Sequence, residues 1–153
     1  MIVDKFNQFC DAVALNTGAA ASYLIGDQID LGTVPADLGH ADQLYLVIKV
    51  TTAITAAATG TLSFTLASDA AAALTPASAS KHLTTPVFDA AAGIAANTIL
   101  YAGKLPFAGN VPYERYLGIL QNTGVAAITA GAVDAFLCKD LAAWKAYPNA
   151  AGA

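Results

Sequence analysis

Apolar and polar side chains alternate over short stretches of the chain, which is the period expected of β-strands with one buried face. In residues 43–52, the apolar side chains of Leu46, Ile48 and Val50 fall on one face. Residues 61–68 repeat the pattern after a short connection that ends in Gly. We therefore expect these two stretches to pair as antiparallel neighbours.

Similar stretches recur along the chain, and Gly and Pro residues separate them. We predict eight strands, over residues 22–25, 28–31, 43–52, 61–68, 83–88, 98–105, 115–121 and 128–137. Residues 69–74 and 89–92 each start with Asp before an Ala run, so each predicts at most one helical turn. This pattern predicts an all-β fold, an antiparallel β-sandwich that resembles a jelly roll.

Residues 112–137 predict a hairpin of two core strands. Two β-prone runs flank Gln121-Asn122-Thr123-Gly124, a polar break that ends in Gly. A break of this kind favours a tight turn, so we expect the chain to reverse here and the two strands to pair.

With 153 residues, the chain is expected to form one main domain. We predict an N-terminal arm over residues 1–20, a β-sandwich over 21–140 and a C-terminal tail over 141–153. Charged residues make up 12% of the chain, about half the usual share, and Ala makes up roughly a quarter. A surface with few charges costs little to desolvate, which favours subunit or partner interfaces over the alternative of an Ala-rich monomer.

The charge pattern argues against nucleic-acid and membrane partners. The net charge is −4 and the seven Lys and Arg residues are scattered singly, whereas phosphate binding needs clustered positive charge. No apolar run approaches the length of a membrane span, and the N-terminus lacks the pattern of a signal peptide. We therefore expect the protein to be made in a cytoplasm. There, free thiols at Cys10 and Cys138 are favoured over a disulfide between them.

The sequence contains no motif for catalysis, metal binding or a cofactor. His40 and His82 lie far apart in the chain, Glu114 is the only glutamate, and no Gly-x-Ser-x-Gly, Walker loop or Cys-x-x-Cys occurs. Asp27 and Asp30 are spaced as in some calcium loops but lack the alternating ligands and the closing Glu. We therefore predict that the protein is not an enzyme and holds no metal or cofactor.

Several motifs resemble the capsid cement (decoration) proteins of short-tailed bacteriophages, of the Bordetella-phage type. They are the opening Asp4-Lys-Phe-Asn-Gln-Phe-Cys-Asp-Ala12, then Ile29-Asp-Leu-Gly32, Lys104-Leu-Pro106, Glu114-Arg-Tyr-Leu117 and Thr129-Ala-Gly-Ala-Val-Asp-Ala135. The resemblance implies a jelly-roll-like sandwich in which the last two motifs form one hairpin. It also implies a structural virion protein that binds the outside of an icosahedral head and bridges major capsid protein subunits. Such a protein would form a homo-dimer or trimer at a capsid symmetry axis.

The candidate contacts with the capsid or with neighbouring subunits are Phe6, Phe9, Asp11, Trp144 and Tyr147. Chain ends can reach neighbouring subunits, and aromatic side chains are favoured anchors of interfaces. The alternative for Phe6, Phe9 and Trp144 is that they close the ends of the sandwich core.

Two other classes of function stay open on the sequence. A carbohydrate- or host-surface-binding module on the virion would present a planar row of exposed aromatic side chains, and Trp144 is the only tryptophan. A jelly-roll enzyme of the cupin type would need a cluster of His and carboxylate metal ligands, which two distant histidines fit poorly.

Overall fold

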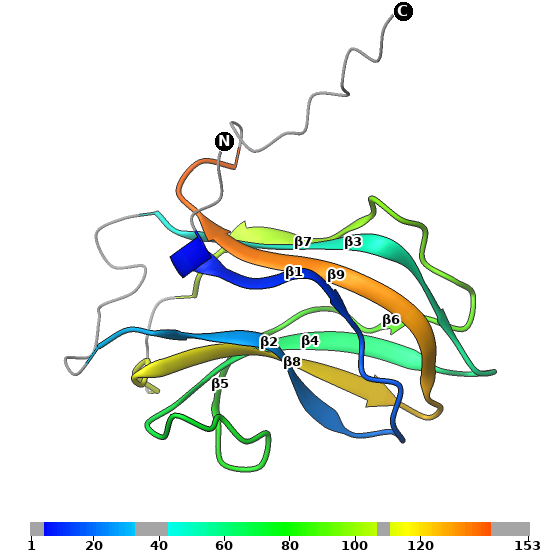
Figure 1. Ribbon diagram of the computed structural model, residues 1–153, viewed down its shortest axis with the longest axis horizontal. Helices are drawn as coiled ribbons and strands as arrows, with labels where there is room; N and C mark the ends of the chain where they lie inside the picture. Colours follow the sequence, from blue (N-terminus) through cyan, green and yellow to red (C-terminus); the bar gives the residue numbers. More distant parts are fainter. Residues whose placement is uncertain (1–4, 33–42, 107–110, 142–153) are drawn as a thin grey trace, which may run out of the picture.

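Two antiparallel sheets pack face to face in the computed structural model, which describes residues 5–32, 43–106 and 111–141 (Figure 1). The predicted all-β, jelly-roll-like sandwich is therefore confirmed. Its elements are η1 (Lys5–Asn7), β1 (Gln8–Ala14), β2 (Ser22–Asp30), β3 (Tyr45–Ala56), β4 (Thr61–Asp69), β5 (Ser80–Thr84), β6 (Phe88–Asp89), β7 (Ile99–Lys104), β8 (Tyr116–Gly124) and β9 (Ile128–Cys138).

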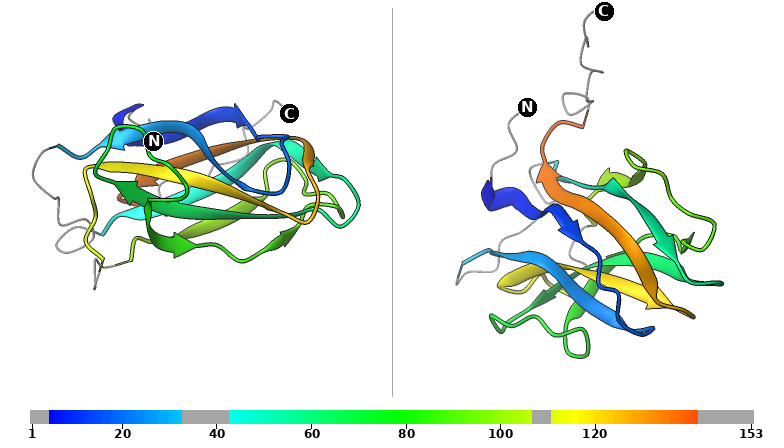
Figure 2. Two further views of the ribbon diagram at one scale, coloured as in Figure 1. Left: turned by 90° about the horizontal axis from the view of Figure 1, so that it is seen from below. Right: turned by 45° about the vertical axis from the view of Figure 1, so that its right-hand side comes forward.

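The strand order is that of a jelly roll. One sheet runs β1-β9-β3-β7 and the other β2-β8-β4-β5, with β6 also paired to β4. The pairs β1–β9, β2–β8, β3–β7 and β4–β5 are all antiparallel and nest inside one another along the sequence. The chain thus resembles one long antiparallel ribbon rolled up so that its successive strand pairs alternate between the two facing layers (Figure 2).

Two strand pairings expected from the sequence are wrong. Strands β3 and β4 lie in different sheets, and so do β8 and β9, so neither pair is a hairpin. The pairs that do form are β3–β9 and β4–β8, and residues 57–60 and 125–127 carry the chain from one layer to the other. Facing sheets are about 10 Å apart, a distance that three or four extended residues span. The length of a connection therefore does not reveal whether it joins strands within a sheet or between sheets.

The polar stretch at 121–124 is strand, not turn. The Gln121 side chain is fully buried and binds the backbone of Asn16, accepting from its N–H (2.8 Å) and donating to its carbonyl (2.9 Å). Asn122, on the outer face of β8, accepts from the Ser22 hydroxyl and donates to Thr65 on β4. Because these polar groups form hydrogen bonds with neighbouring segments of the chain, β8 can continue to Gly124.

Other elements differ from the predicted ones in detail. Residues 22–25 and 28–31 belong largely to a single strand, β2, whose pairing with β8 is interrupted by a bulge. Residues 83–88 contain the end of β5 and the start of β6, while 69–74 and 89–92 form no helix. In the part of the chain that the structure describes, η1 is the one helical element and no helix is long and apolar enough to cross a membrane.

The predicted N-terminal arm contains a strand of the sandwich. Within residues 1–20, β1 pairs with β9 and lies at the edge of its sheet. Its Phe9 and Cys10 side chains are each 1% exposed and belong to the core, together with large side chains of both sheets such as Ile48, Phe64 and Leu117. Burial of each such apolar side chain contributes about 1.5–3 kcal/mol, so β1 is part of the cooperative fold.

Both cysteines are buried free thiols, as predicted from the sequence. Cys10 lies in the core between the sheets, whereas Cys138 packs with Val47 and Phe136 in a separate cluster. Burial is the main cause that raises the pKa of Cys10 to about 12, and the charges of Asp134 and Asp27 add to it. The Cys10 thiol therefore stays protonated at neutral pH.

Replacing Gly26 with Ala tests the close approach of β1 and β2. Gly26 has a φ of 65°, and a Cβ atom there would collide with the Phe9 carbonyl oxygen and lie 2.6 Å from Cys10 Sγ. We expect the free energy of unfolding, measured with urea, to fall by about 2–4 kcal/mol. Gly32 is the matched control, because it has a φ of 88° but, among the described residues other than its chain neighbours, no atom lies within 4 Å of the position that a Cβ would take there. Its replacement by Ala should cost only about 1–2 kcal/mol, and equal losses would contradict the steric argument.

Candidate functional site

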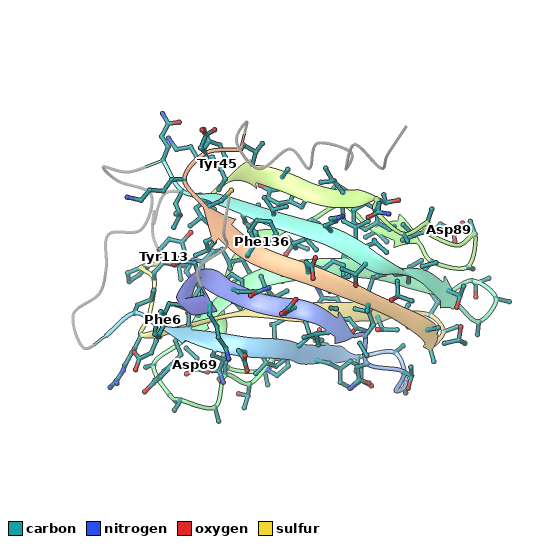
Figure 3. The ribbon with its side chains drawn as sticks, turned by 45° about the horizontal axis from the view of Figure 1, so that its top comes forward. Phe6, Tyr45, Asp69, Asp89, Tyr113 and Phe136 are labelled. Carbon is teal, nitrogen blue, oxygen red and sulfur yellow. The ribbon has the colours of Figure 1, made fainter. Side chains whose placement is uncertain are left out.

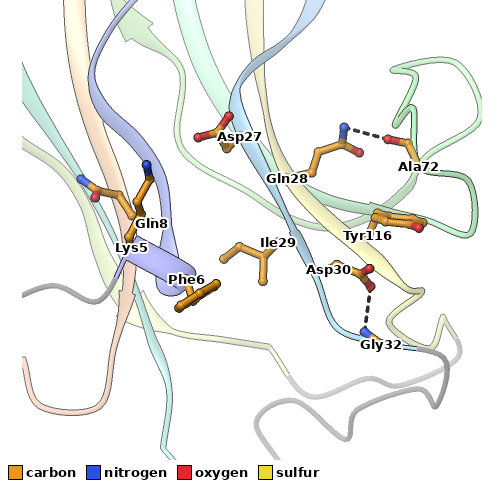
Figure 4. Close-up of a pocket in the computed structure, with 10 residues that line it drawn as sticks. All are labelled: Lys5, Phe6, Gln8, Asp27, Gln28, Ile29, Asp30, Gly32, Ala72 and Tyr116. Carbon is orange, nitrogen blue, oxygen red and sulfur yellow. Dashed lines mark hydrogen bonds between the residues drawn. The ribbon is translucent and has the colours of Figure 1, made fainter.

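An open groove follows the side of the sandwich where the edge strands β1 and β2 face each other. It has a volume of about 820 Å³. We call it the edge groove, and it is lined by Lys5, Phe6, Gln8, Asp27, Gln28, Ile29, Asp30, Gly32, Ala72 and Tyr116. Figure 4 shows these side chains on both sides of β2, with Phe6 near Ile29 and with Gln28 and Tyr116 beyond the strand.

Phe6 is the most exposed large apolar side chain in the described part of the protein. It lies on η1, immediately before β1, and 84% of its surface is exposed. The other aromatic side chains of the described ranges are buried or half-buried, so those ranges contain no planar row of exposed aromatic rings. An exposed aromatic ring beside a groove is a natural anchor for a protein partner.

Asp30 and Arg115 form a two-point ion pair at one end of the edge groove. Arg115 donates from Nε to Asp30 Oδ1 (2.9 Å) and from Nη2 to Oδ2 (2.8 Å). The Gly32 N–H also donates to Asp30 Oδ1, at 2.8 Å, and the Arg115 guanidinium lies 5.0 Å from the centre of the Tyr116 ring. These contacts fix the end of β2 against the start of β8.

The ion pair connects two motifs that are far apart in the sequence. Asp30 belongs to the Ile-Asp-Leu-Gly stretch and Arg115 to the Glu-Arg-Tyr-Leu stretch, and the Leu31 N–H also donates to the Arg115 carbonyl at 2.8 Å. Both strands were predicted from the sequence, but their pairing was not. The sequence signal was an acidic residue in one motif and a basic residue in the other.

A smaller hollow adjoins the edge groove on the β1 side. Its volume is about 480 Å³, and it shares Lys5, Gln8 and Asp27 with the edge groove. Asp11 of β1 also lines it and is exposed. Charged side chains of both signs thus surround the exposed Phe6 ring.

The structure brings together two of the five predicted contact residues. Phe6 lies in the edge groove and Asp11 in the adjoining hollow. Phe9 is 1% exposed because β1 turns its ring toward the core, so the core alternative holds for Phe9 and its assignment as a surface contact is wrong. Trp144 and Tyr147 lie outside the described residues.

Outside the edge groove, one pair of polar side chains resembles the nucleophile and base of a catalytic site. Ser68 Oγ lies 2.7 Å from His82 Nε2, but the Ser68 side chain is completely buried. No substrate can reach this hydroxyl group, so the pair does not form a nucleophilic site. Among the described residues, no group of three or more His, Cys, Asp or Glu side chains is arranged to hold a metal ion.

Replacing Arg115 with Gln tests the ion pair. The hydrogen bonds from Arg115, followed by the one from Gly32, lower the pKa of Asp30 from 3.8 to about 2. Because the folded-state pKa is lowered, the pair's contribution to stability is present above about pH 4 and is lost as the pH falls toward 2. In the variant, we expect the pKa of Asp30, followed by NMR, to rise toward 3.8.

Asp69 provides an internal control for this titration. Its pKa is lowered mainly by the Ala71 N–H and the Ser78 hydroxyl, not by Arg115. The titration of Asp69 should therefore be the same in both proteins. An Asp30 midpoint that does not move in the variant would show that Arg115 does not hold this carboxylate.

The comparisons with known proteins give a family. The model of the Bbp16 family matches residues 9–137, from the start of the core in β1 to the end of β9. The match covers more than four fifths of the chain and includes both motifs joined by the Asp30–Arg115 pair. A comparison with curated proteins found no match. The family name fits the Bordetella-phage resemblance of the sequence motifs. The chain thus belongs to the Bbp16 family.

Proposed function

We propose that the protein is a structural virion protein that binds the outer surface of an icosahedral phage head. It stabilises the capsid by bridging neighbouring major capsid protein subunits, and it associates with itself as a dimer or trimer at a symmetry axis. It is made in the cytoplasm of the bacterial host and acts on the capsid without catalysis, metal or direct contact with nucleic acid.

The observation that carries this proposal is the meeting of the resembling motifs at the molecular surface. Residues 29–32 and 114–117 supply Asp30, Arg115 and Tyr116 to the end of the edge groove, beside the exposed Phe6. The family match and the jelly-roll strand order support the same proposal. Because these motifs meet at the surface, we favour a role for them in binding a partner over a role in core packing alone.

The composition of the surface also supports a role in a repeated assembly. Only 12% of the residues are charged, and many exposed positions are Ala, as in the connections at 57–58 and 91–92. Contacts of this kind are weak singly, because each buries little area. Repeated by the symmetry of a shell and linked by self-association, they give high avidity without one strong site.

Within this function, the edge groove is the surface that contacts the capsid. The Phe6 ring supplies an apolar anchor, and Lys5, Asp11 and Asp27 supply charges of both signs around it. In typical interfaces, an aromatic residue surrounded by a polar rim carries much of the binding energy.

Replacing Phe6 with Ser tests this surface. We expect the affinity for expanded heads that lack the protein to fall by about 30-fold, the effect of losing about 2 kcal/mol from an anchor residue. Because the ring is 84% exposed, the free energy of unfolding should change by less than about 0.5 kcal/mol. Binding is measured by co-sedimentation of the protein with the heads over a range of concentrations.

Val125 provides the matched control. It is 74% exposed. It follows Gly124, which pairs with Thr61 of β4, and Thr61 also pairs with Asp89 of β6. Val125 therefore lies at the same end of the sandwich as Asp89. Figure 3 shows Asp89 at the end of the sandwich opposite Phe6. Val125→Ser should leave head binding unchanged. An equal loss in both variants would contradict the edge groove as the contact surface, and an absence of binding by the unaltered protein would contradict the proposed function itself.

A further inference from the structure

His82 of β5 takes part in a partly buried chain of hydrogen bonds that the capsid function does not use. The Glu114 N–H donates to Ser68 Oγ (3.0 Å), and Ser68 Oγ lies 2.7 Å from His82 Nε2. The His82 ring also stacks on Tyr113, with 4.0 Å between the ring centres. The cluster therefore joins β4, β5 and the segment that leads into β8.

The hydrogen-bond pattern favours a neutral imidazole. Ser68 Oγ already accepts from the Glu114 N–H, and the Ser68 side chain is fully buried, away from water. Its own hydrogen is satisfied when it points at an unprotonated His82 Nε2, with the ring proton on Nδ1. If His82 gains a second proton, Nε2 becomes a donor and the Ser68 hydroxyl loses this acceptor.

We propose that His82 is an acid-sensitive latch that holds residues 113–115 against β4 and β5. In the neutral form, the imidazole accepts from Ser68 and covers the Tyr113 ring. In the protonated form, the charged ring favours water over this half-buried site and turns away. The Tyr113 face is then uncovered, and the Glu114 N–H to Ser68 bond is weakened.

The electrostatic surroundings favour the neutral form. Burial lowers the pKa of His82 below its usual 6.5, and the negative charge of Glu114 opposes this shift only in part. Tyr113 does not titrate in the same range, because burial and, to a lesser extent, Tyr101 raise its pKa to about 12. Lys81, beside His82 on β5, is exposed to solvent. Since the folded-state pKa is lowered, stability decreases as the pH falls through 6.5 and continues to decrease down to the folded-state value.

The latch acts next to the edge groove. Glu114 immediately precedes Arg115, which binds Asp30 at the end of the groove. Tyr113 is also held by its hydroxyl group, which donates to the Pro106 carbonyl at 2.8 Å. Acid should therefore loosen the start of β8 locally while the opposite end of the sandwich stays closed.

Hydrogen exchange of the Glu114 amide, followed by NMR, tests the latch in the full chain. After correction for the intrinsic exchange rate, we expect its protection to fall about tenfold or more between about pH 8 and about pH 5. The fall should begin near pH 6.5 and level off at the titration midpoint of the His82 ring in the same samples. The Leu15 amide, which donates to the Gly131 carbonyl near the opposite end, is the internal control and should keep its protection.

Two variants separate the latch from general acid sensitivity. His82→Gln removes the titrating group, so the protection of the Glu114 amide should no longer depend on pH. Ser68→Ala removes the acceptor, so the protection should be low at both pH values. The proposal is overturned if His82→Gln keeps the pH dependence, or if the unaltered protein shows equal protection at both pH values. A His82 pKa at or above 6.5 would also overturn it, and that titration requires no variant.

Discussion

The structure depends on the mutual burial of the two apolar sheet faces. Leu46, Ile48 and Val50 of one sheet and Phe64 and Leu117 of the other belong to a single core. Neither sheet could keep these side chains from water alone, so the strands must be divided between two layers. The nested strand pairs divide the strands between two layers in this way, and the outermost pair places β1 beside β9. The first and last strands of the described chain therefore lie in the same sheet, and β1 supplies Phe9 to the core.

The same arrangement produces the edge groove. Rolling up the ribbon leaves β1 and β2 as the edges of their sheets on one side, where Gly26 lets the two backbones approach closely. The β1 edge is modified against strand addition. β1 is bulged, with Ala12 at a φ of 49°, and the Gln8 side chain donates to the Cys10 carbonyl. The β1 edge therefore presents side chains rather than a free row of backbone groups, which makes the exposed Phe6 ring central to the proposed binding.

The fold class and most strands could be predicted from the sequence because alternation reports directly which strand faces are buried. Pairing could not be predicted, because residues 57–60 and 125–127 are long enough for either a hairpin or a crossing between layers. The strand β1 was missed because its bulges break the alternation of Gln8–Ala14. At the site, Phe6 and Asp11 could be proposed from chemistry and position, whereas the Asp30–Arg115 pair depends on contacts between residues 85 positions apart.

Hydrogen bonds between distant segments differ in how much they contribute to the stability of the fold. Those of Gln121 and Ser68 are buried, so removing one partner leaves a polar group without water and costs about 1–3 kcal/mol. The Asp30–Arg115 pair is largely exposed, so water screens it and its removal affects the fold less. Stability thus resides mainly in the core and the buried network, while the edge groove carries exposed groups. Substitutions in the groove should therefore change the proposed binding without unfolding the protein, whereas the proposed protonation of His82 acts on the partly buried network and reaches the groove through the start of β8.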